Sequence, residues 1–403
     1  MRIVQPLRNR AFAGLWLSYS ASIVATAILP TALTLMILDW KNGIADLGIA
    51  LSARTFGFLA GAVAGGYFAD NWPRQRVLSS ASALRSVAVL AIAWVPHANI
   101  LSVSCCLFFA GAGEGTFRSA YQASMADLVP GGQLQSANAL TTLSMRIALT
   151  VGPLIAVALH GRLGPLFGLQ LAGALWALSA LASLTLQRRL HACDRTTPAS
   201  GTNILADFRA GLAEAFRHRW FVAGLAALLV WLGLGNSVQQ LMLPVISRAH
   251  LGGDAFIGIA LGAYSVGALA GGIAMGSMRM RRPGALAFCG LALFGLVPLA
   301  LATHSAILII SAYFLGGIGI ELFNIPWFTA IQNEVPKEML GRVSSIDFLI
   351  SYGAAPLALA AMPAALAAIG PGNALVSIGL IVATVPIIAL LVPSAPEFKE
   401  PRR

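Results

Sequence analysis

Apolar residues follow one another in long runs along the whole chain, and short polar segments separate these runs. Each run is long enough to cross a hydrocarbon core of about 30 Å as a helix. The alternation of apolar and polar residues that is typical of membrane strands is absent from them. We therefore predict an all-α integral membrane protein with twelve transmembrane helices, at about residues 12–37, 47–69, 77–96, 99–123, 135–159, 164–187, 219–247, 255–278, 284–303, 305–332, 340–366 and 371–393.

The longest polar stretch, from Gln187 to Trp220, divides the twelve runs six to six. It predicts an N-terminal six-helix bundle over residues 1–187, a cytoplasmic linker over 188–218, and a C-terminal six-helix bundle with a short cytoplasmic tail over 219–403. Apolar residues recur every fourth position within the linker, at Ile204, Phe208, Leu212 and Phe216. This spacing is typical of an amphipathic helix on the membrane surface, and we expect it to face lipid rather than a partner protein.

The two halves match each other at one constant spacing of 206 residues. The matched positions lie in two separate regions of each half, which unrelated apolar segments would rarely produce. Most are glycines, in the pairs Gly61 and Gly267, Gly65 and Gly271, Gly66 and Gly272, Gly111 and Gly317, and Gly113 and Gly319. We interpret the halves as structural repeats, an arrangement that typically places a binding site near the membrane midplane.

Charge changes the picture by fixing an orientation. The chain is 58% hydrophobic and 10% charged, with a formal net charge of +11. Nineteen loop lysines and arginines lie in one alternating set of loops, whereas the opposite set holds only Lys41, Arg162 and Arg248. By the positive-inside rule, the basic loops and both termini are cytoplasmic, in a multi-pass plasma (bacterial inner) membrane protein. The basicity therefore reflects topology within a lipid bilayer, so we expect no nucleic-acid partner, and we expect a monomer.

No group of residues indicates an enzyme. The four cysteines, Cys105, Cys106, Cys193 and Cys289, have no spacing typical of a metal site, and we interpret them as small buried apolar residues. The glycine-rich segment GAGEGTF lies inside an apolar run and follows no strand, which argues against a nucleotide site. We expect no metal and no cofactor, with a proton gradient as the source of energy.

The loop after the second apolar run carries the clearest motif. Gly66 and Asp70 are followed there by Arg74 and Arg76, in the stretch GGYFADNWPRQRVL. This pattern resembles the loop signature of the major facilitator superfamily. The segments LRNRAFAGLWLS near the start and FRSAYQASMADLVPGGQLQSANAL over residues 117–140 are similar to its drug- and siderophore-efflux branch, which includes macrolide and enterobactin exporters.

The resemblance covers nearly the whole chain and implies a major facilitator fold. It also implies that Asp70 holds a cytoplasmic gate shut against the start of the eleventh helix, near residues 341–345. A carboxylate is favoured at such a helix N-terminus because unpaired N–H groups point outward there. Members of this branch often have Gly-Asp in the first helix. This chain has Ala21-Ser22 instead, so no proton carrier is expected at that place.

Ionisable residues within the predicted spans are candidates for function, because a lone charge in the bilayer is costly. Glu114 and Arg118 lie four residues apart on one helix face, and Arg146 reaches a similar depth on the next helix. We predict that Glu114, flanked by Arg118 and Arg146, couples proton movement to substrate movement. A static salt bridge between these helices is the alternative.

The second half has its own candidates. Glu321 lies in the middle of the tenth span with no arginine evident nearby, so we predict an unpaired carboxyl and a second proton carrier. Neutral hydrogen-bonding and aromatic side chains are predicted to line the substrate cavity, namely Asn236, Gln240, Asn324, Tyr121 and Trp327.

The remaining intramembrane charges are assigned by depth. Asp347 is near the cytoplasmic end of the eleventh span and is predicted to join the gate with Arg342. Arg85 is placed on the same side and is predicted to pair with gate acids. Arg54 is nearer the outer face, where a long side chain reaches water easily, so we interpret it as structural.

Together these patterns predict a secondary active transporter that works by rocker-switch alternating access, as a proton-coupled exporter of a small drug-like or siderophore-like molecule. The interior holds four arginines against three acids, which favours an anionic cargo by a single charge. Import or facilitated movement of a small organic anion is one alternative. A membrane receptor or lipid-handling protein that does not transport is another.

Overall fold

The computed structural model describes residues 5–40, 42–92, 99–129, 131–184, 204–277, 281–336 and 339–399. These residues form helices joined by short turns, with no strand among them, which confirms the all-α class. The chain separates into two compact units, residues 1–196 and 197–403, and the division falls inside the segment assigned above to the linker.

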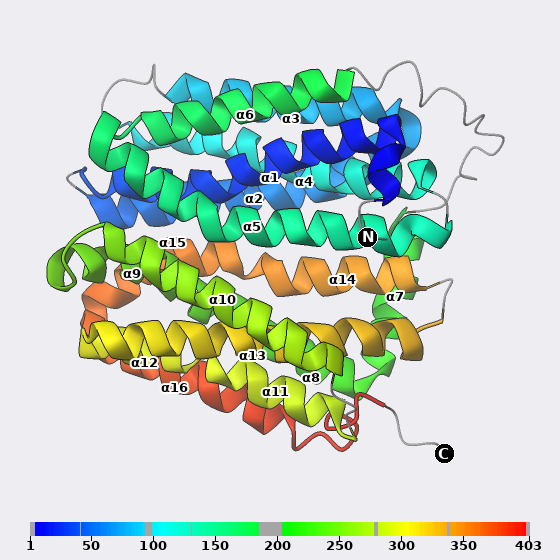
Figure 1. Ribbon diagram of the computed structural model, residues 1–403. Helices are drawn as coiled ribbons and strands as arrows, with labels where there is room; N and C mark the ends of the chain where they lie inside the picture. Colours follow the sequence, from blue (N-terminus) through cyan, green and yellow to red (C-terminus); the bar gives the residue numbers. More distant parts are fainter. Residues whose placement is uncertain are drawn as a thin grey trace. The chain divides into compact units, whose positions relative to one another are not determined.

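Unit 1 contains one short 3-10 turn, Gln5–Arg8, and six long helices (Figure 1). The helices are α1 (Arg10–Ile37), α2 (Gly43–Asn71), α3 (Arg74–Ile92), α4 (Ile100–Leu128), α5 (Gly131–Leu163) and α6 (Phe167–Leu184). Within this unit α4 packs against α2 and α3, while α1 packs against α5 and α6.

Unit 2 begins with the amphipathic helix α7 and then also forms six spans, three of which are broken into two helices. The elements are α7 (Ile204–Arg217), α8 (Arg219–Val230), a π-helical turn (Trp231–Gly235), α9 (Asn236–His250), α10 (Ala255–Ser277), α11 (Pro283–Leu293), α12 (Leu296–Thr303), α13 (Ala306–Glu334), α14 (Leu340–Gly353), α15 (Ala355–Ile369) and α16 (Pro371–Ala389). The broken spans are α8 with α9, α11 with α12, and α14 with α15.

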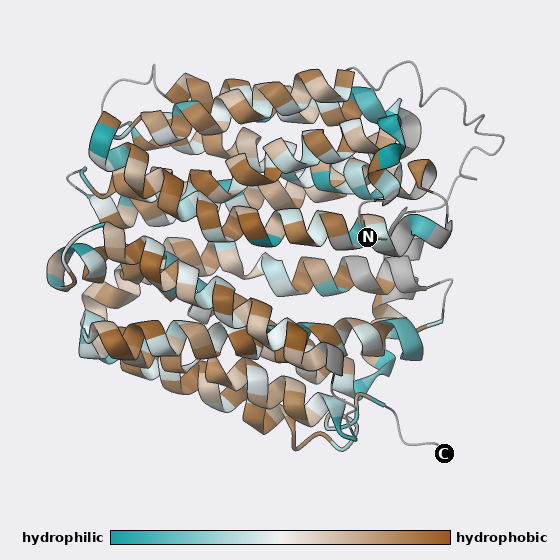
Figure 2. Ribbon diagram, viewed as in Figure 1, coloured by the Kyte–Doolittle hydropathy of each residue, from teal (hydrophilic) through white to brown (hydrophobic). Residues whose placement is uncertain are grey.

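Eleven helical segments within the described residues are long and apolar enough to cross a membrane. The third predicted span, residues 77–96, corresponds to α3 and continues into residues outside the described part of the chain. Figure 2 shows the apolar residues running along the helices of each unit, with hydrophilic residues gathered near helix ends and turns.

Glycines bring α2 and α4 into backbone contact. A Cβ on Gly57 would collide with the carbonyl of Phe108, and a Cβ on Gly61 would collide with Ala112. The contact is possible because glycine has no side chain at these positions. These glycines, spaced four residues apart, are therefore the packing surface of this helix pair.

The same packing occurs between α10 and α13 in unit 2, with a different register. Gly267 meets the carbonyl of Phe314 as Gly57 meets that of Phe108, whereas the constant spacing of 206 matches Gly267 with Gly61. The repeat spacing therefore holds for α4 and α13, but α10 is displaced by one helical turn relative to α2. The expectation that the spacing of 206 residues also relates structurally equivalent positions is wrong for α2 and α10.

The amphipathic helix α7 belongs to unit 2 and packs against α8 and α14. Leu212 packs against the core of that unit and Ala215 is fully buried in it, whereas Phe216 is 55% exposed. The described part of the predicted apolar stripe is thus divided. Leu212 contacts protein rather than lipid, contrary to expectation, because α7 packs against α8 and α14. The side chains of Ile204 and Phe208 lie outside the described residues.

Candidate functional site

A cavity of about 300 Å³ lies within unit 1, and four helices contribute its walls. Its polar lining includes two arginines and one carboxylate, and three of the other lining residues are aromatic. The residues are Tyr19, Ser22, Ile23 and Thr26 of α1, Arg85 of α3, Glu114, Phe117, Arg118, Tyr121, Gln122 and Met125 of α4, and Asn138, Thr141, Thr142 and Met145 of α5. Polar groups that converge beside aromatic rings in a concavity are typical of a small-molecule site.

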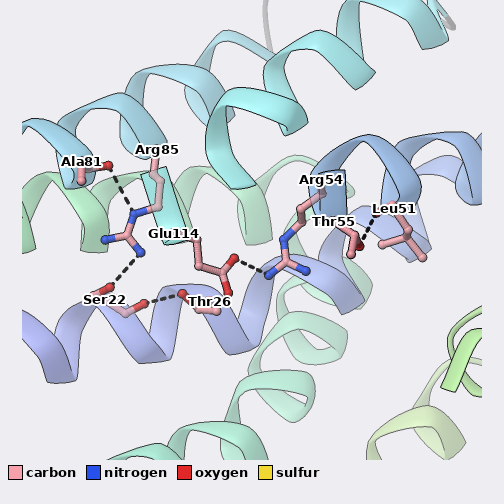
Figure 3. Close-up of polar contacts among 8 residues, drawn as sticks. All are labelled: Ser22, Thr26, Leu51, Arg54, Thr55, Ala81, Arg85 and Glu114. Carbon is pink, nitrogen blue, oxygen red and sulfur yellow. Dashed lines mark hydrogen bonds and ion pairs between the residues drawn. The ribbon is translucent and has the colours of Figure 1, made fainter. Parts of the chain in front are cut away.

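Glu114 forms the ion pair of this cavity. Its Oε2 accepts a hydrogen bond of 2.7 Å from Nη2 of Arg54 (Figure 3). The two side chains, of Arg54 and Glu114, are 16% and 22% exposed, so water screens the pair only partly. Close packing of α2 on α4 explains the contact, since Gly111 lies directly against the backbone carbonyl of Arg54 and Glu114 follows less than one turn later.

Arg85 is the second charged group of the cavity, and it is only 1% exposed. Its Nη1 donates to the hydroxyl of Ser22 at 2.9 Å, its Nη2 donates to the hydroxyl of Ser82 at 3.1 Å, and its Nε donates to the carbonyl of Ala81 at 3.4 Å. Gly113 makes this placement possible, because a Cβ there would lie 2.7 Å from Cγ of Arg85.

Aromatic rings lie on the Arg85 guanidinium. Its Cζ is 4.6 Å from the ring centroid of Phe117 and 5.2 Å from that of Trp176. Such cation–π contacts stabilise a guanidinium that has left water. Figure 3 shows Arg85 reaching α1 from α3, with Glu114 between Arg85 and Arg54 in this view.

A group of buried serine hydroxyls lies behind Arg85 and joins α1, α3 and α6. The Oγ of Ser82 is 3.1 Å from that of Ser179, which is 3.0 Å from that of Ser18. Ser18 also contacts the Oγ of Ser183 at 2.8 Å. These neutral dipoles hold Ser82 in place as an acceptor for the guanidinium and offset part of the cost of burying it.

Three aromatic residues form a stacked wall of the cavity. The rings of Tyr19 and Tyr121 are 4.3 Å apart, and Phe117 is stacked on Tyr121 at 6.2 Å. The hydroxyl of Tyr121 is 2.9 Å from that of Thr141 on α5, which fixes the ring. Phe117 therefore contacts both the ring of Tyr121 and the guanidinium of Arg85.

The fold agrees with the family to which the sequence can be matched. The family model of the Major Facilitator Superfamily matches residues 15–359, which is most of the chain. The chain belongs to the Major Facilitator Superfamily. It is therefore a multi-pass membrane transporter and not an enzyme.

Curated relatives of this superfamily member include the enterobactin exporter EntS of Escherichia coli O1:K1 and that of Shigella boydii serotype 18. Each is 26% identical over 365 residues, which are 83% of this chain and 80% of the relative. A POT family transporter in complex with 5-aminolevulinic acid has a similar structure, with a TM-score of 0.79, 14% identity and 97% of each chain covered. The nucleoside transporter NupG is also similar, with a TM-score of 0.77 at 12% identity, covering 96% of this chain and 99% of that one. At these identities the structural similarities show the fold alone.

The structure changes the predicted partners of Glu114. Arg118 lines the same cavity, but the ion pair is with Arg54, for which depth alone predicts a structural role. Arg146 is half-buried on α5 and is not among the residues that line this cavity. Depth alone misplaces Arg54, because the contact depends on how closely α2 approaches α4.

Glu321 is buried in α13, with 6% exposure. It is not without a partner there, so the expectation of an unpaired carboxyl is wrong. Asn324 is half-buried on the same helix. Asn236 and Gln240 are half-buried at the start of α9, directly after the π-helical turn Trp231–Gly235. Such turns occur often at functional sites, so these two amides stay candidates.

Trp327 does not line a cavity as predicted, because it is a core residue of unit 2. It is 1% exposed and its ring is stacked on Phe221 at 5.1 Å. Its Nε1 donates to Oδ1 of Asp347 at 3.2 Å. Aromatic residues at helical spacing are often used for packing, and this one is.

The predicted gate lies only partly within the described residues. Gly66, Asp70 and Arg342 lie in α2 and α14, but their surroundings are outside the described part of the structure. Arg74 donates from Nη1 to the carbonyl of Ala123 at 2.6 Å, and Arg76 is exposed. These contacts leave the gate assignment as a prediction.

The structure corrects the prediction that Arg85 belongs to the same gate. Its guanidinium lies in the cavity and is bonded to hydroxyls of α1 and α3. The sequence does contain a signal for part of this arrangement, since Ser82 lies three residues before Arg85 on one helix face. The partnership with Ser22 has no such local signal.

Proposed function

We propose that the protein is a proton-coupled exporter of a small organic molecule of the siderophore type, and that Glu114 carries the proton. The proposal is supported by similarity to enterobactin exporters over 83% of the chain. The single observation that carries it is the Glu114–Arg54 ion pair at the wall of a cavity of ligand size.

A carboxylate in this position can respond to both a proton and a substrate. Protonation of Glu114 removes the charge that holds Arg54, and the 2.7 Å contact then loses most of its electrostatic stabilisation. Because Glu114 also lines the cavity, a bound molecule changes the free energy of that protonation. Two ligands that affect one group are thermodynamically linked, which is the basis of coupling.

Alternating access would use the two units as rigid bodies. Backbone-to-backbone glycine contacts fix α2 on α4 and α10 on α13, so each unit can move without internal rearrangement of these pairs. The distribution of lysine and arginine supports cytoplasmic termini and a cytoplasmic connection between the units.

The charge of the cavity favours a second candidate, import of an organic anion together with a proton. Arg85 and Arg118 line the cavity with Glu114. An anion binds beside these arginines most readily when Glu114 is neutral, so proton and anion would bind together. Binding together leads to movement in the same direction, whereas export against proton entry needs the two to alternate.

The direction of proton movement distinguishes these candidates. Inverted vesicles containing the protein and a luminal pH dye are given enterobactin on the cytoplasmic face, without any other gradient. Release of protons from the lumen as enterobactin enters supports coupled export. Acidification of the lumen supports anion–proton symport. Glu114→Gln should abolish either proton signal, whereas Glu397→Gln, at an exposed residue outside the cavity, should retain it. Enterobactin movement without proton movement in the unaltered protein would refute coupling.

A further inference from the structure

Arg85 is a buried cation whose direct contacts are all neutral. Its three hydrogen bonds end on two serine hydroxyls and a backbone carbonyl, and none of its contacts among the described residues is to a carboxylate. A guanidinium has five N–H donors, so one on each terminal nitrogen has no acceptor within the described structure. Glu114 lines the same cavity and attracts the guanidinium through space, but it is not bonded to it. Burying a charge whose hydrogen bonds all end on neutral groups is costly, and charged groups within membrane spans often mark functional sites.

We propose that Arg85 binds the anionic group of the transported molecule, and that this molecule carries an aromatic ring next to that group. This inference rests on the proposed function only in assuming that cargo enters the cavity of unit 1. A planar carboxylate matches the forked donors of a guanidinium.

The aromatic requirement follows from how close the cation is to the stacked wall. Phe117 lies 4.6 Å from the guanidinium carbon and 6.2 Å from the ring of Tyr121. An anion held by Arg85 therefore lies in a cavity that Phe117 and Tyr121 also line. A ring joined directly to the anionic group can stack there, and a cavity of about 300 Å³ has room for it.

Ser22 offers a way to test the cation without removing it. Its hydroxyl is 2.9 Å from Nη1 of Arg85. A carboxylate introduced by Ser22→Asp would occupy the donors of Arg85 from within the protein and compete with any external anion. Ser22→Asn introduces a side chain of the same shape as Asp without the charge. It adds no charge beside Arg85 and is the matched control.

The probes are single-ring compounds measured by equilibrium dialysis with the full-length protein in lipid nanodiscs. Salicylate represents the aromatic anion, cyclohexanecarboxylate the non-aromatic anion, and benzamide the neutral ring. We expect saturable salicylate binding in the millimolar range, as small fragments allow. Arg85→Gln and Ser22→Asp should each weaken it about tenfold or more, as loss of a charge-assisted hydrogen bond does. Benzamide binding should change less than about twofold, within the range of a neutral contact.

Two comparisons separate binding from folding. Arg281→Gln, at an exposed arginine of unit 2, should leave salicylate binding unchanged, and Ser22→Asn, which adds no charge, should weaken it much less than Ser22→Asp does. Ser22→Asp supplies a counter-ion to Arg85 and should unfold at a higher temperature than the unaltered protein. It therefore reports on the site even where Arg85→Gln does not fold.

Equal salicylate binding by the unaltered protein and Ser22→Asp would overturn the proposal, as would absence of saturable binding. Equal affinity for salicylate and cyclohexanecarboxylate would overturn its aromatic part. The vesicle experiment can fail independently. Salicylate binding that depends on Arg85, without coupled export, would refute the proposed exporter while supporting this anion site. Coupled export together with salicylate binding that does not depend on Arg85 would support the exporter and refute the site.

Discussion

Arg54 of α2 and Glu114 of α4 are joined at 2.7 Å across a helix pair whose backbones touch. Glu114 also lines the cavity of unit 1, so one carboxylate belongs both to the helix contact and to the candidate binding site. A change in its charge therefore acts on packing and on binding together. This dual position distinguishes Glu114 from a salt bridge that only holds helices in place.

Removing one member of this pair should cost more than removing both. Arg54→Leu leaves a partly buried carboxylate without its donor and should lower the free energy of unfolding by about 1–3 kcal/mol. The double variant Arg54→Leu with Glu114→Leu should recover much of that loss, because no unpaired charge is left. Thermal unfolding of the detergent-solubilised single and double variants measures the coupling. Additive losses would show that the 2.7 Å contact contributes nothing in solution.

Two glycines of α10 should respond oppositely to alanine. A Cβ on Gly267 would collide with the carbonyl of Phe314, so Gly267→Ala should destabilise the protein by about 1–3 kcal/mol through overpacking. A Cβ on Gly272 would have no described atom outside its own helix turn within 4 Å, so Gly272→Ala should be neutral or stabilise the helix by up to about 1 kcal/mol. Thermal unfolding distinguishes the two. Equal effects would contradict the backbone contact between α10 and α13.

The close packing of α2 on α4 and of α10 on α13 separates what the sequence predicts from what it does not. The long apolar runs and the polar segment between the halves are local features of the sequence, so the spans and the division into two units could be predicted. The partner of Glu114 could not, because Arg54 lies 60 residues away and its proximity depends on the register between two helices. The one-turn displacement of Gly267 relative to the repeat spacing shows how far that register departs from sequence similarity.

Arg85 illustrates the second limit. Its depth in α3 suggests a gate residue, but its side chain extends past Gly113 to Ser22 of α1. A long side chain can place its charge well away from its own Cα, so sequence depth locates the backbone and not the guanidinium. The aromatic residue Trp327 is misassigned for a related reason, since burial in a core and exposure in a cavity have the same sequence spacing.

The hydrogen bond from Trp327 to Asp347 should stabilise unit 2 without contributing to cargo binding. Trp327→Phe keeps an aromatic ring in the core but removes the Nε1 donor 3.2 Å from the buried carboxyl. We expect a loss of about 1–3 kcal/mol in unfolding free energy. Adding Asp347→Asn should reduce that penalty, because the residue left behind is then neutral. Loss of transport by Trp327→Phe with unchanged thermal stability would restore its predicted place in the cavity.

The C-terminal segment after α16 should be an integral part of unit 2. Phe398 is 1% exposed, adopts a left-handed backbone with φ of 51°, and lies 5.4 Å from the ring of Trp220. The chain before it is tied to α11, because Ala285 N donates to the carbonyl of Pro396 at 2.9 Å. A buried ring and a backbone bond together hold the segment against the bundle.

Phe398→Ala should therefore cost about 3–5 kcal/mol, the range for removing a fully buried aromatic ring. Lys399→Ala, next to it and exposed, should change stability by less than about 0.5 kcal/mol, as surface substitutions do. Thermal unfolding of both variants in detergent measures the difference. If Phe398→Ala is as stable as Lys399→Ala, the segment does not pack against Trp220 in solution, and the aromatic core of unit 2 ends at α16.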